Sequence, residues 1–432
     1  MSRSRTFASL SVYNYRVYFA GALVSNVGTW MGRTAQDWLV LTQLTPHDAT
    51  ALGIVTALQF APVVLLAPFA GAITDRFPKR RILFGTQSAL AITAALLAVL
   101  VLTDVVTLWQ VYALAALQGV ATALDNPSRQ AFVSEMVEPG LLSNAVGLNA
   151  TSFNAARLIG PGIAGLCIGL IGTGQTLVFN TFSFIAVLIA LKAMRPGELM
   201  PAPQVRGKGK VREGLAYVRR RPDLMLIMFM VFMLGTFGMN FQLTIALMAT
   251  TVFHQGAAEY GLLGSIMAIG SLAGALMAAR RQRPRLRIVL WSLTGFTVFS
   301  ALASLAPSYL LFAVFLIPTG LCAITTLNTA NATVQLSVTP VMRGRVMALY
   351  MAIFMGGTPI GAPVIGWIGS EFGARWTILV GSVATAVTVV TAMTYLMRRD
   401  DLRLRLEGRP IPHFEVRHRD NPSDDLAGQR AA

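Results

Sequence analysis

The residues best suited to do chemistry in this 432-residue chain are three charged side chains inside apolar stretches. Arg33, Asp37 and Arg157 each interrupt such a stretch, where an ionisable group costs about 2.5–3.5 kcal/mol on membrane-insertion scales. Arg33 and Asp37 are four residues apart and share one face of a helix. Either they neutralise each other as a structural pair, or Asp37 takes up and releases a proton. Arg157 has no partner in its own stretch, so it either pairs with Asp37 or Asp125 or binds an anionic, catecholate-like ligand.

Groups that would indicate an enzyme are missing from the sequence. All four histidines lie outside the apolar stretches, no stretch contains a cluster of His, Cys and Glu, and no G-x-x-x-x-G-K-[ST] phosphate loop occurs. Cys167 and Cys322 lie inside apolar stretches, where packing is the expected role of a thiol and a disulfide is not expected. We therefore expect no catalytic residue, no metal and no cofactor, and the chain is not expected to be an enzyme.

The elements that must position these charges are predicted to be membrane-spanning helices. Hydrophobic residues make up 54% of the chain and charged residues 12%, which is about half the charged share of a soluble domain. Apolar runs of about 18 residues or more indicate transmembrane helices. Twelve such runs occur, roughly at 16–42, 51–73, 82–103, 107–125, 142–171, 175–194, 224–251, 259–279, 286–306, 308–330, 345–369 and 375–397. The predicted fold class is an all-α integral membrane protein.

The net charge of +16, from 35 Lys and Arg against 19 Asp and Glu, indicates how the helices are oriented. Alternate loops, at 43–50, 104–107, 172–175, 252–258, 306–308 and 370–374, contain no Lys or Arg, whereas the other loops and the terminal segments are basic. This positive-inside pattern predicts that both termini are cytoplasmic. Because the basic residues sit in separate loops rather than on one face, no nucleic-acid partner is expected, and contact with anionic lipid of the bilayer is a sufficient role.

The chain divides into two related halves. Residues 1–195 hold six predicted helices, 196–223 form a basic cytoplasmic linker with a short amphipathic helix at Val211–Tyr217, 224–397 hold six more, and 398–432 form a cytoplasmic tail expected to be disordered. A shift of 201 positions superposes Gly and Pro residues of the halves without a gap, in the pairs Gly119/Gly320, Pro139/Pro340, Gly160/Gly361 and Gly165/Gly366. A duplicated six-helix unit predicts a cavity between the halves, although small residues are common at all membrane helix interfaces.

The loop after the second run carries the most specific motif. It reads Gly71-Ala-Ile-Thr-Asp75-Arg76-Phe-Pro-Lys79-Arg80-Arg81 and resembles the G-x-x-x-D-R-x-x-[RK]-[RK]-[RK] signature of the major facilitator superfamily. A basic stop-transfer cluster would explain the three cations at the end of the motif, but neither the glycine nor the acid.

The resemblance implies a gating latch on the cytoplasmic side. Gly71 permits the close approach of two helices. Asp75 meets the positive N-terminal end of a helix of the other half near Gly344, and Arg76 pairs with Asp125 at the end of the fourth run.

A second motif lies in the fifth run. Gly160-Pro161 with Gly165 resembles the G-P-x-x-x-G signature of exporters in the superfamily. Pro161 kinks its helix and the glycines allow tight packing. The resemblance implies export, while a kinked packing helix without directional meaning is the alternative.

Longer stretches resemble one branch of the superfamily over about residues 10–397. They are Gly28-Thr-Trp30-Met, Gln36-Asp37-Trp38-Leu, Asp125-Asn-Pro-Ser-Arg129-Gln-Ala-Phe, Asn144-Ala-Val-Gly-Leu-Asn149 and Arg343-Gly-Arg345-Val-Met. Together they resemble the transmembrane secretion effector group, which is similar to enterobactin exporters. One departure is Ala115, which stands where drug–proton antiporters carry an arginine, so their coupling mechanism is not carried over.

The resemblance implies a secondary active exporter of a small amphipathic solute, such as a drug, siderophore or other natural product. We expect a monomer in the bacterial inner membrane that works by alternating access and is driven by proton influx. An importer or uniporter of the same fold is the alternative, and a membrane enzyme or transport-inactive sensor a more remote one. On the family's pattern the cavity is lined by Trp30, Gln118, Phe237, Asn240, Phe241, Gln242 and Asn328, although each can equally pack in the core or face lipid.

Overall fold

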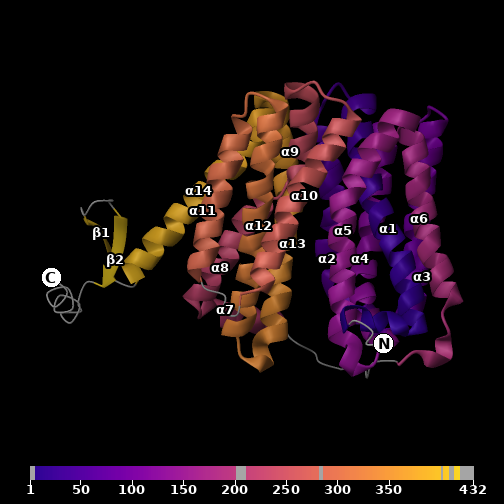
Figure 1. Ribbon diagram of the computed structural model, residues 1–432, viewed down its shortest axis with the longest axis horizontal. Coiled ribbons are helices and arrows are strands. Elements are labelled where there is room, and N and C mark those ends of the chain that lie inside the picture. Colours follow the sequence, from indigo (N-terminus) through magenta and orange to yellow (C-terminus); the bar gives the residue numbers. More distant parts are fainter. Residues whose placement is uncertain (1–4, 201–210, 282–285, 400–401, 408–412, 419–432) are drawn as a thin grey trace.

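A computed structural model describes residues 5–200, 211–281, 286–399, 402–407 and 413–418. In these residues the chain forms a bundle of long helices that run side by side (Figure 1). Residues 201–210 of the linker and most of the predicted tail lie outside the described residues.

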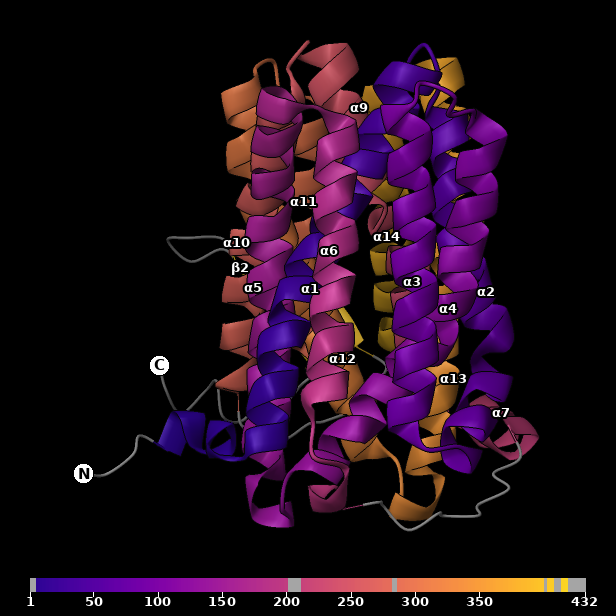
Figure 2. The ribbon, with the colours of Figure 1, turned by 90° about the vertical axis from the view of Figure 1, so that its right-hand side faces the viewer.

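The first half consists of six long helices. They are α1 (Tyr13–Trp38), which continues as the π-helical turn η2 (Leu39–Leu44), α2 (Ala49–Arg76), α3 (Lys79–Leu102), α4 (Leu108–Met136), α5 (Pro139–Ile171) and α6 (Thr173–Ala193). Short 3-10 turns precede and follow them, η1 (Arg5–Ser11) and η3 (Pro196–Glu198). α1 packs against α5 and α6, α3 against α4 and α6, and α2 against α4, as Figure 2 shows from the side of this half.

The second half begins with a broken rod instead of one continuous helix. This rod comprises α8 (Pro222–Met233), η4 (Leu234–Gly238), α9 (Phe241–Leu247) and η5 (Met248–Val252). It is followed by α10 (Ala257–Ala279), α11 (Leu286–Ser304), α12 (Tyr309–Ser337), α13 (Pro340–Phe372) and α14 (Ala374–Arg399). The amphipathic helix predicted in the linker is confirmed as α7 (Val211–Arg219), whose Glu213 pairs with Arg345 of α13 at 2.6 Å.

The predicted repeat is confirmed by the helix boundaries. The bounds of α4 and α12, and those of α5 and α13, differ by the same 201 positions. α5 and α13 both begin with proline and both end before a glycine with positive φ, Gly172 at 93° and Gly373 at 94°. Only glycine adopts such a φ without strain, so the duplicated unit keeps both its start and its stop signal.

Ten stretches of described helix are long and apolar enough to cross a membrane, judged by length and composition. α1 and α4 are not among them. α1 contains the polar residues Asn26, Arg33 and Asp37, and α4 contains Asp125 and Arg129 in its second half. The predicted number of twelve spans therefore depends on these two helices.

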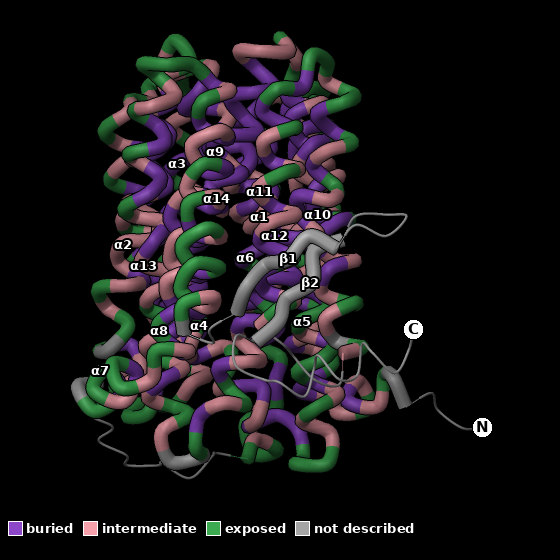
Figure 3. The backbone as a smooth tube through the Cα atoms, turned by 90° about the vertical axis from the view of Figure 1, so that its left-hand side faces the viewer, coloured by how far each residue is buried: buried purple, intermediate pink, exposed green. Residues whose placement is uncertain are grey.

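The two ends of the bundle differ in charge and in packing. We call the end of the bundle where α7 lies and α1 begins the basic end, and the other the opposite end (Figure 1). One hydrophobic cluster joins both halves, and its members from the first half, such as Leu39, Leu52 and Val55, lie toward the opposite end. A separate cluster around Tyr18 and Phe132 serves only the first half, near the basic end. Figure 3 shows the buried positions gathered inside the bundle.

The C-terminal segment holds the only strands of the described residues. β1 (Leu402–Glu407) and β2 (His413–His418) pair antiparallel after α14. No regular structure was expected there from the sequence, whereas the helical fold class holds for the described bundle itself.

Candidate functional site

A cavity of about 220 Å³ lies between the two halves. α1, α2 and α5 line it from one side, and the η4–α9 region, α10 and α13 line it from the other. Both charged side chains of its wall, Arg33 and Arg157, come from the first half, while the second half supplies three methionines and two phenylalanines. The cavity therefore has a cationic wall and a largely apolar wall.

Trp30 organises the cationic wall. The Arg33 Cζ lies 5.4 Å from the Trp30 ring centroid and 5.5 Å from that of Phe60. The Arg157 Cζ lies 5.8 Å from the same Trp30 ring, against which Phe153 packs edge-on. Since the face of an aromatic ring attracts cations, Trp30 holds two guanidinium groups at one side of the cavity.

Asp37 makes its contact across the halves. Its Oδ2 accepts a hydrogen bond from the Tyr260 hydroxyl of α10 at 3.4 Å, and the Tyr260 ring stacks on Trp38 with centroids 6.2 Å apart. In the described residues Asp37 forms no ion pair with Arg33, and Arg157 forms none with Asp37 or Asp125. The pairings predicted for these charges are thus not formed in this conformation.

The export-type motif lies where α5 crosses α10. A Cβ added at Gly165 would collide with the Ala257 carbonyl oxygen, and one added at Gly261 would collide with the Pro161 carbonyl oxygen. The Gly162 N–H donates to the Ser265 Oγ at 3.1 Å. Proline and glycine at these positions therefore bring the two halves into backbone contact.

Gly160 has a different neighbour. A Cβ at this position would meet the Trp30 Cβ of α1 at 2.6 Å. Gly160 thus lets α5 approach α1 within the first half, behind the ring that holds both arginines.

A second crossing, between α2 and α13, mirrors the first. Gly366 faces the Ala49 carbonyl and Gly53 faces the Ala362 carbonyl, so that a Cβ at either glycine would collide. Gly366 is the repeat equivalent of Gly165. The two crossings are therefore related by the duplication.

Polar contacts reinforce this crossing at the opposite end. The Ser370 Oγ lies 3.0 Å from the Thr50 Oγ1 and 2.9 Å from the Asp48 Oδ1. Together the two crossings hold the halves together at this end of the bundle.

The motif residues at the basic end do not join the halves. Asp75 and Arg76 are exposed, and Asp75 has no hydrogen bond or ion pair in the described structure. A Cβ added at Gly71, where a close helix approach is predicted, or at Gly344, near which Asp75 is predicted to lie, has no atom within 4 Å. The contacts predicted for the latch are therefore not formed in this conformation.

Two basic residues of the motif act within the first half, while Arg81 is exposed. The Lys79 Nζ pairs with the Glu135 Oε1 of α4 at 2.9 Å. The Arg80 Nε and Nη2 donate to the Leu191 carbonyl of α6 at 2.9 and 2.7 Å. These contacts fix the start of α3.

Asp125 does not pair with Arg76 but with its own helix and α3. Its Oδ1 accepts from the Thr86 Oγ1 at 2.8 Å and the Gln87 Nε2 at 2.7 Å, and its Oδ2 accepts from the Arg129 Nη2 at 3.0 Å. The carboxylate is buried, with 4% of its residue surface exposed. The predicted partner is replaced because Arg129, one helical turn on, reaches the same carboxylate from within α4.

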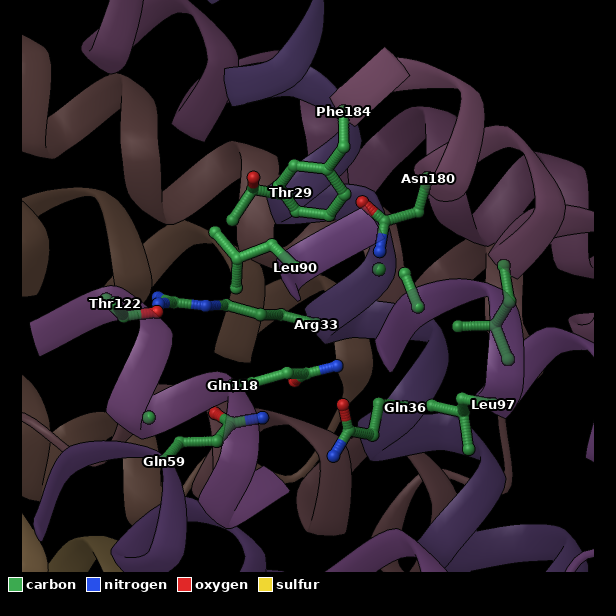
Figure 4. A pocket seen from close by; sticks show the side chains of 14 residues that line it. Thr29, Arg33, Gln36, Gln59, Leu90, Leu97, Gln118, Thr122, Asn180 and Phe184 are labelled. Atoms are coloured by element: carbon green, nitrogen blue, oxygen red, sulfur yellow. The ribbon is translucent and has the colours of Figure 1, made fainter. Parts of the chain in front are cut away.

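A smaller pocket of about 50 Å³ lies inside the first half. Figure 4 shows amide side chains gathered around it with Arg33, those of Gln36, Gln59, Gln118 and Asn180. A pocket of this polarity and size accommodates water. Because Arg33 also lines the central cavity, its side chain forms part of the wall of both pockets.

Comparison with known proteins places the chain among transporters. Residues 4–416 match the model of one family, described as transmembrane secretion effector. The chain belongs to this family. The resemblance predicted from its motifs is thus confirmed, and this transmembrane secretion effector is a multi-pass protein of the bacterial inner membrane within the major facilitator superfamily.

Two relatives match nearly the whole length of this chain. The staphyloferrin A transporter of Staphylococcus aureus is 24% identical over 395 residues, which cover 91% of this chain and 98% of the relative. The enterobactin exporter EntS of Citrobacter koseri is 23% identical over 425 residues, with 95% and 99% covered. A solved mutant of the peptide transporter POT superposes with a TM-score of 0.73 at 13% identity, over 92% of this chain and 99% of the other, and shares the fold.

Only some of the residues predicted to line the cavity lie in the wall of the central cavity between the halves. Trp30, Phe241 and Gln242 line it. Asn240 lines a small neighbouring pocket and donates to the Thr236 carbonyl, and Gln118 lines the pocket inside the first half. Phe237 and Asn328 are not part of the central wall, and Asn328 is exposed.

Phe60 and Tyr260 were missed by the sequence prediction. Both sit in apolar runs, on α2 and α10, which contribute none of the predicted lining residues. No local pattern distinguishes them from packing residues.

Proposed function

We propose that this transmembrane secretion effector exports a small amphipathic solute by alternating access, with proton influx as the driving reaction. Drugs, siderophores and other natural products are the candidate solutes. The enterobactin exporter among its relatives and the mixed polarity of the cavity wall support this proposal. Family and structural neighbours are transporters, so a membrane enzyme has no support among them.

The proposed topology has twelve spans in two six-helix halves, residues 1–195 and 224–397, joined by the linker 196–223. α1 and α4 count as spans because they pack among helices that are apolar enough to cross the membrane. The basic end then faces the cytoplasm with both termini and the tail 398–432, in keeping with the positive-inside rule. We propose a monomer, since one chain supplies both walls of the cavity.

The contact pattern between the halves carries the proposal. At the opposite end the two glycine crossings bring the backbones together. At the basic end a Cβ at Gly71 or Gly344 would meet nothing within 4 Å, and Asp75 has no hydrogen bond or ion pair within the described residues. In the proposed topology this conformation faces the cytoplasm, which is where an exporter takes up its cargo.

Asp37 is the proposed coupling residue. It lies buried where the halves meet, in contact with Tyr260 of the other half. When the halves separate at the opposite end this contact breaks, and the carboxylate becomes accessible to protons from outside the cell. The protonation of Asp37 would thus depend on which end of the bundle is open.

Uptake into everted membrane vesicles tests the proposal. Vesicles with the protein should accumulate a solute of the candidate classes above the level of vesicles without it, and an uncoupler should abolish the difference. Accumulation only in right-side-out vesicles would make the protein an importer, and equilibration that ignores the proton gradient would make it a uniporter.

A further inference from the structure

We infer that the cargo carries an acidic group, which Arg33 and Arg157 bind on the first-half wall of the central cavity, while its apolar part packs on the second half. This inference rests on the proposed function and narrows the substrate class to amphipathic anions. The acid can be a carboxylate, a sulfonate or a group of similar charge and shape, since guanidinium groups bind planar oxyanions through paired N–H donors.

The two arginines differ from Arg129 and Arg375 in having no acceptor. Arg129 is paired with Asp125, and the Arg375 Nη1 donates to the Ser304 carbonyl at 2.7 Å. Within the described residues, no hydrogen bond or ion pair joins either guanidinium group to an acceptor. Both groups lie over aromatic rings, and Asp37 attracts Arg33 in addition. A guanidinium group that is largely withdrawn from water and forms no ion pair is costly, so we expect an acceptor that is not part of the chain.

Charge in the cavity is positive. The carboxylate of Asp37 attracts Arg33, but its Oδ2 accepts from the Tyr260 hydroxyl and it forms an ion pair with neither arginine. The cavity region therefore holds two guanidinium groups and one carboxylate, and that carboxylate is hydrogen-bonded to the other half. This excess charge favours an anion and repels a cationic solute.

The arginines are also oriented for binding. Their guanidinium groups lie over the Trp30 and Phe60 rings, an arrangement that holds the charge while the N–H edges stay free to donate. The Arg129 Nη1 is one of the buried polar atoms that have no hydrogen-bond partner, whereas no nitrogen of Arg33 or Arg157 is among those atoms. These donors thus border open space.

The second half supplies an uncharged, apolar wall. Met239, Phe241, Ile245 and Met267 line it, and flexible methionines adapt to ligands of different shape. The repeat equivalent of Arg157 is Thr358, which also lines the cavity. The duplicated site therefore keeps a charge on one side only, which matches a cargo with one acidic and one apolar end.

Equilibrium binding of two matched probes tests this inference. Naphthalene sulfonate is a permanent anion, and naphthalene sulfonamide is its neutral analogue. Isothermal titration of the full chain in nanodiscs, with empty nanodiscs as reference, should show at least tenfold tighter binding of the sulfonate. Arg33→Gln and Arg157→Gln should each weaken sulfonate binding by about tenfold to hundredfold and change sulfonamide binding less than about twofold.

Matched variants separate charge from structure. Arg220→Gln removes one positive charge from the exposed end of α7 and should leave both affinities unchanged. Arg157→Lys keeps the charge and should retain part of the sulfonate affinity. All variants are compared after their melting temperatures have been measured.

Three results would overturn the inference. The first is a wild-type protein that binds the sulfonate no more tightly than the sulfonamide. The second is an equal loss of affinity for both probes in the glutamine variants. The third is displacement of the sulfonate by low-millimolar chloride, which would assign the arginines to an inorganic counter-ion. Because binding is measured without a gradient, sulfonate binding without export would contradict only the proposed function. Export of a neutral solute without sulfonate binding would contradict only this inference.

Discussion

Asp75 and Asp125, two acids that the sequence assigns to one latch, lie in opposite environments. Asp75 is exposed and has no partner in the described residues, whereas Asp125 is buried and accepts hydrogen bonds from α3 and α4. A buried carboxylate that is paired within its own half in this way is expected to stabilise the fold. An exposed one can act only in a conformation that gives it a partner.

Asp125→Asn is expected to destabilise the protein. The substitution leaves the Arg129 guanidinium without its counter-ion, and removal of one partner of a buried ion pair costs about 3–5 kcal/mol. The melting temperature of the purified protein in detergent should fall clearly below that of the wild type. Asp75→Asn removes an exposed acid of the same helix bundle and is the matched control. Its melting temperature should equal that of the wild type. Equal melting of both variants would show that the Asp125 pair adds no stability.

Asp75→Asn is expected to impair transport without changing protein level or melting temperature. Because Asp75 has no partner while the basic end is open, its effect can arise only when that end closes and the acid meets a helix N-terminus of the other half. Efflux rates in cells with matched amounts of protein measure the effect. Unchanged transport would contradict the latch.

At the scale of elements, two helix crossings decide which end of the molecule is closed. α5 crosses α10 at Gly165 and Gly261, and α2 crosses α13 at Gly53 and Gly366, each with a carbonyl where a side chain would project. Such contacts are available only to glycine, because they bring one backbone against another. The closed end therefore depends on four small residues.

Gly165→Val is expected to weaken the closed opposite end. The added side chain meets the Ala257 carbonyl, and overpacking of this kind costs about 1–3 kcal/mol. Gly169→Val is the matched control, since a Cβ at Gly169, one turn further along α5, meets nothing within 4 Å.

A disulfide cross-link across the α2–α13 crossing measures the fraction of molecules that are closed at the opposite end. Thr50 and Ser370 have hydroxyls 3.0 Å apart, so Thr50→Cys with Ser370→Cys, in a background with Cys167→Ala and Cys322→Ala, should form a disulfide when the end is closed. The yield should fall several-fold with Gly165→Val and stay unchanged with Gly169→Val. Equal yields would show that the α5–α10 crossing does not control closure.

Local sequence patterns predict most of the helices because apolar runs, start prolines and stop glycines are local signals. Two differences have physical causes. α4 and α12 extend beyond their apolar runs to Met136 and Ser337, because buried hydrogen bonds such as those of Asp125 compensate polar side chains near the basic end. The rod at 222–252 is broken at Met239 and Asn240, where the Asn240 side chain donates to the Thr236 carbonyl.

The candidate site is less predictable from sequence than the fold. Trp30 and Arg33 share a helix face, so their contact follows from spacing. Phe60 and Tyr260 reach the same cavity only through the way in which the halves meet, and that depends on the glycine crossings. Contacts between distant segments leave no periodic pattern in the chain.

At the scale of the whole molecule, the duplication makes the scaffold symmetric, but the charge of the cavity is not. Both arginines and Asp37 belong to the first half, while the equivalent wall of the second half is uncharged. A cargo that binds there with a negative charge crosses the membrane together with that charge. In the proposed mechanism, its export would therefore be driven by the membrane potential as well as by protons taken up at Asp37.

The two driving forces can be separated in everted vesicles whose lumen is acidic and positive. For an anion with one charge, a potential of 100 mV contributes about 2.3 kcal/mol, or about fiftyfold accumulation. We expect naphthalene sulfonate to accumulate, nigericin to lower its level by collapsing the pH gradient, and valinomycin with potassium to lower it by collapsing the potential. With Asp37→Asn the response to nigericin should disappear while the response to valinomycin persists, because the variant keeps both arginines but has no carboxylate to protonate. If nigericin still lowers accumulation in Asp37→Asn, the pH gradient acts elsewhere, and Asp37 serves only to join α1 to Tyr260 at the closed end of the bundle.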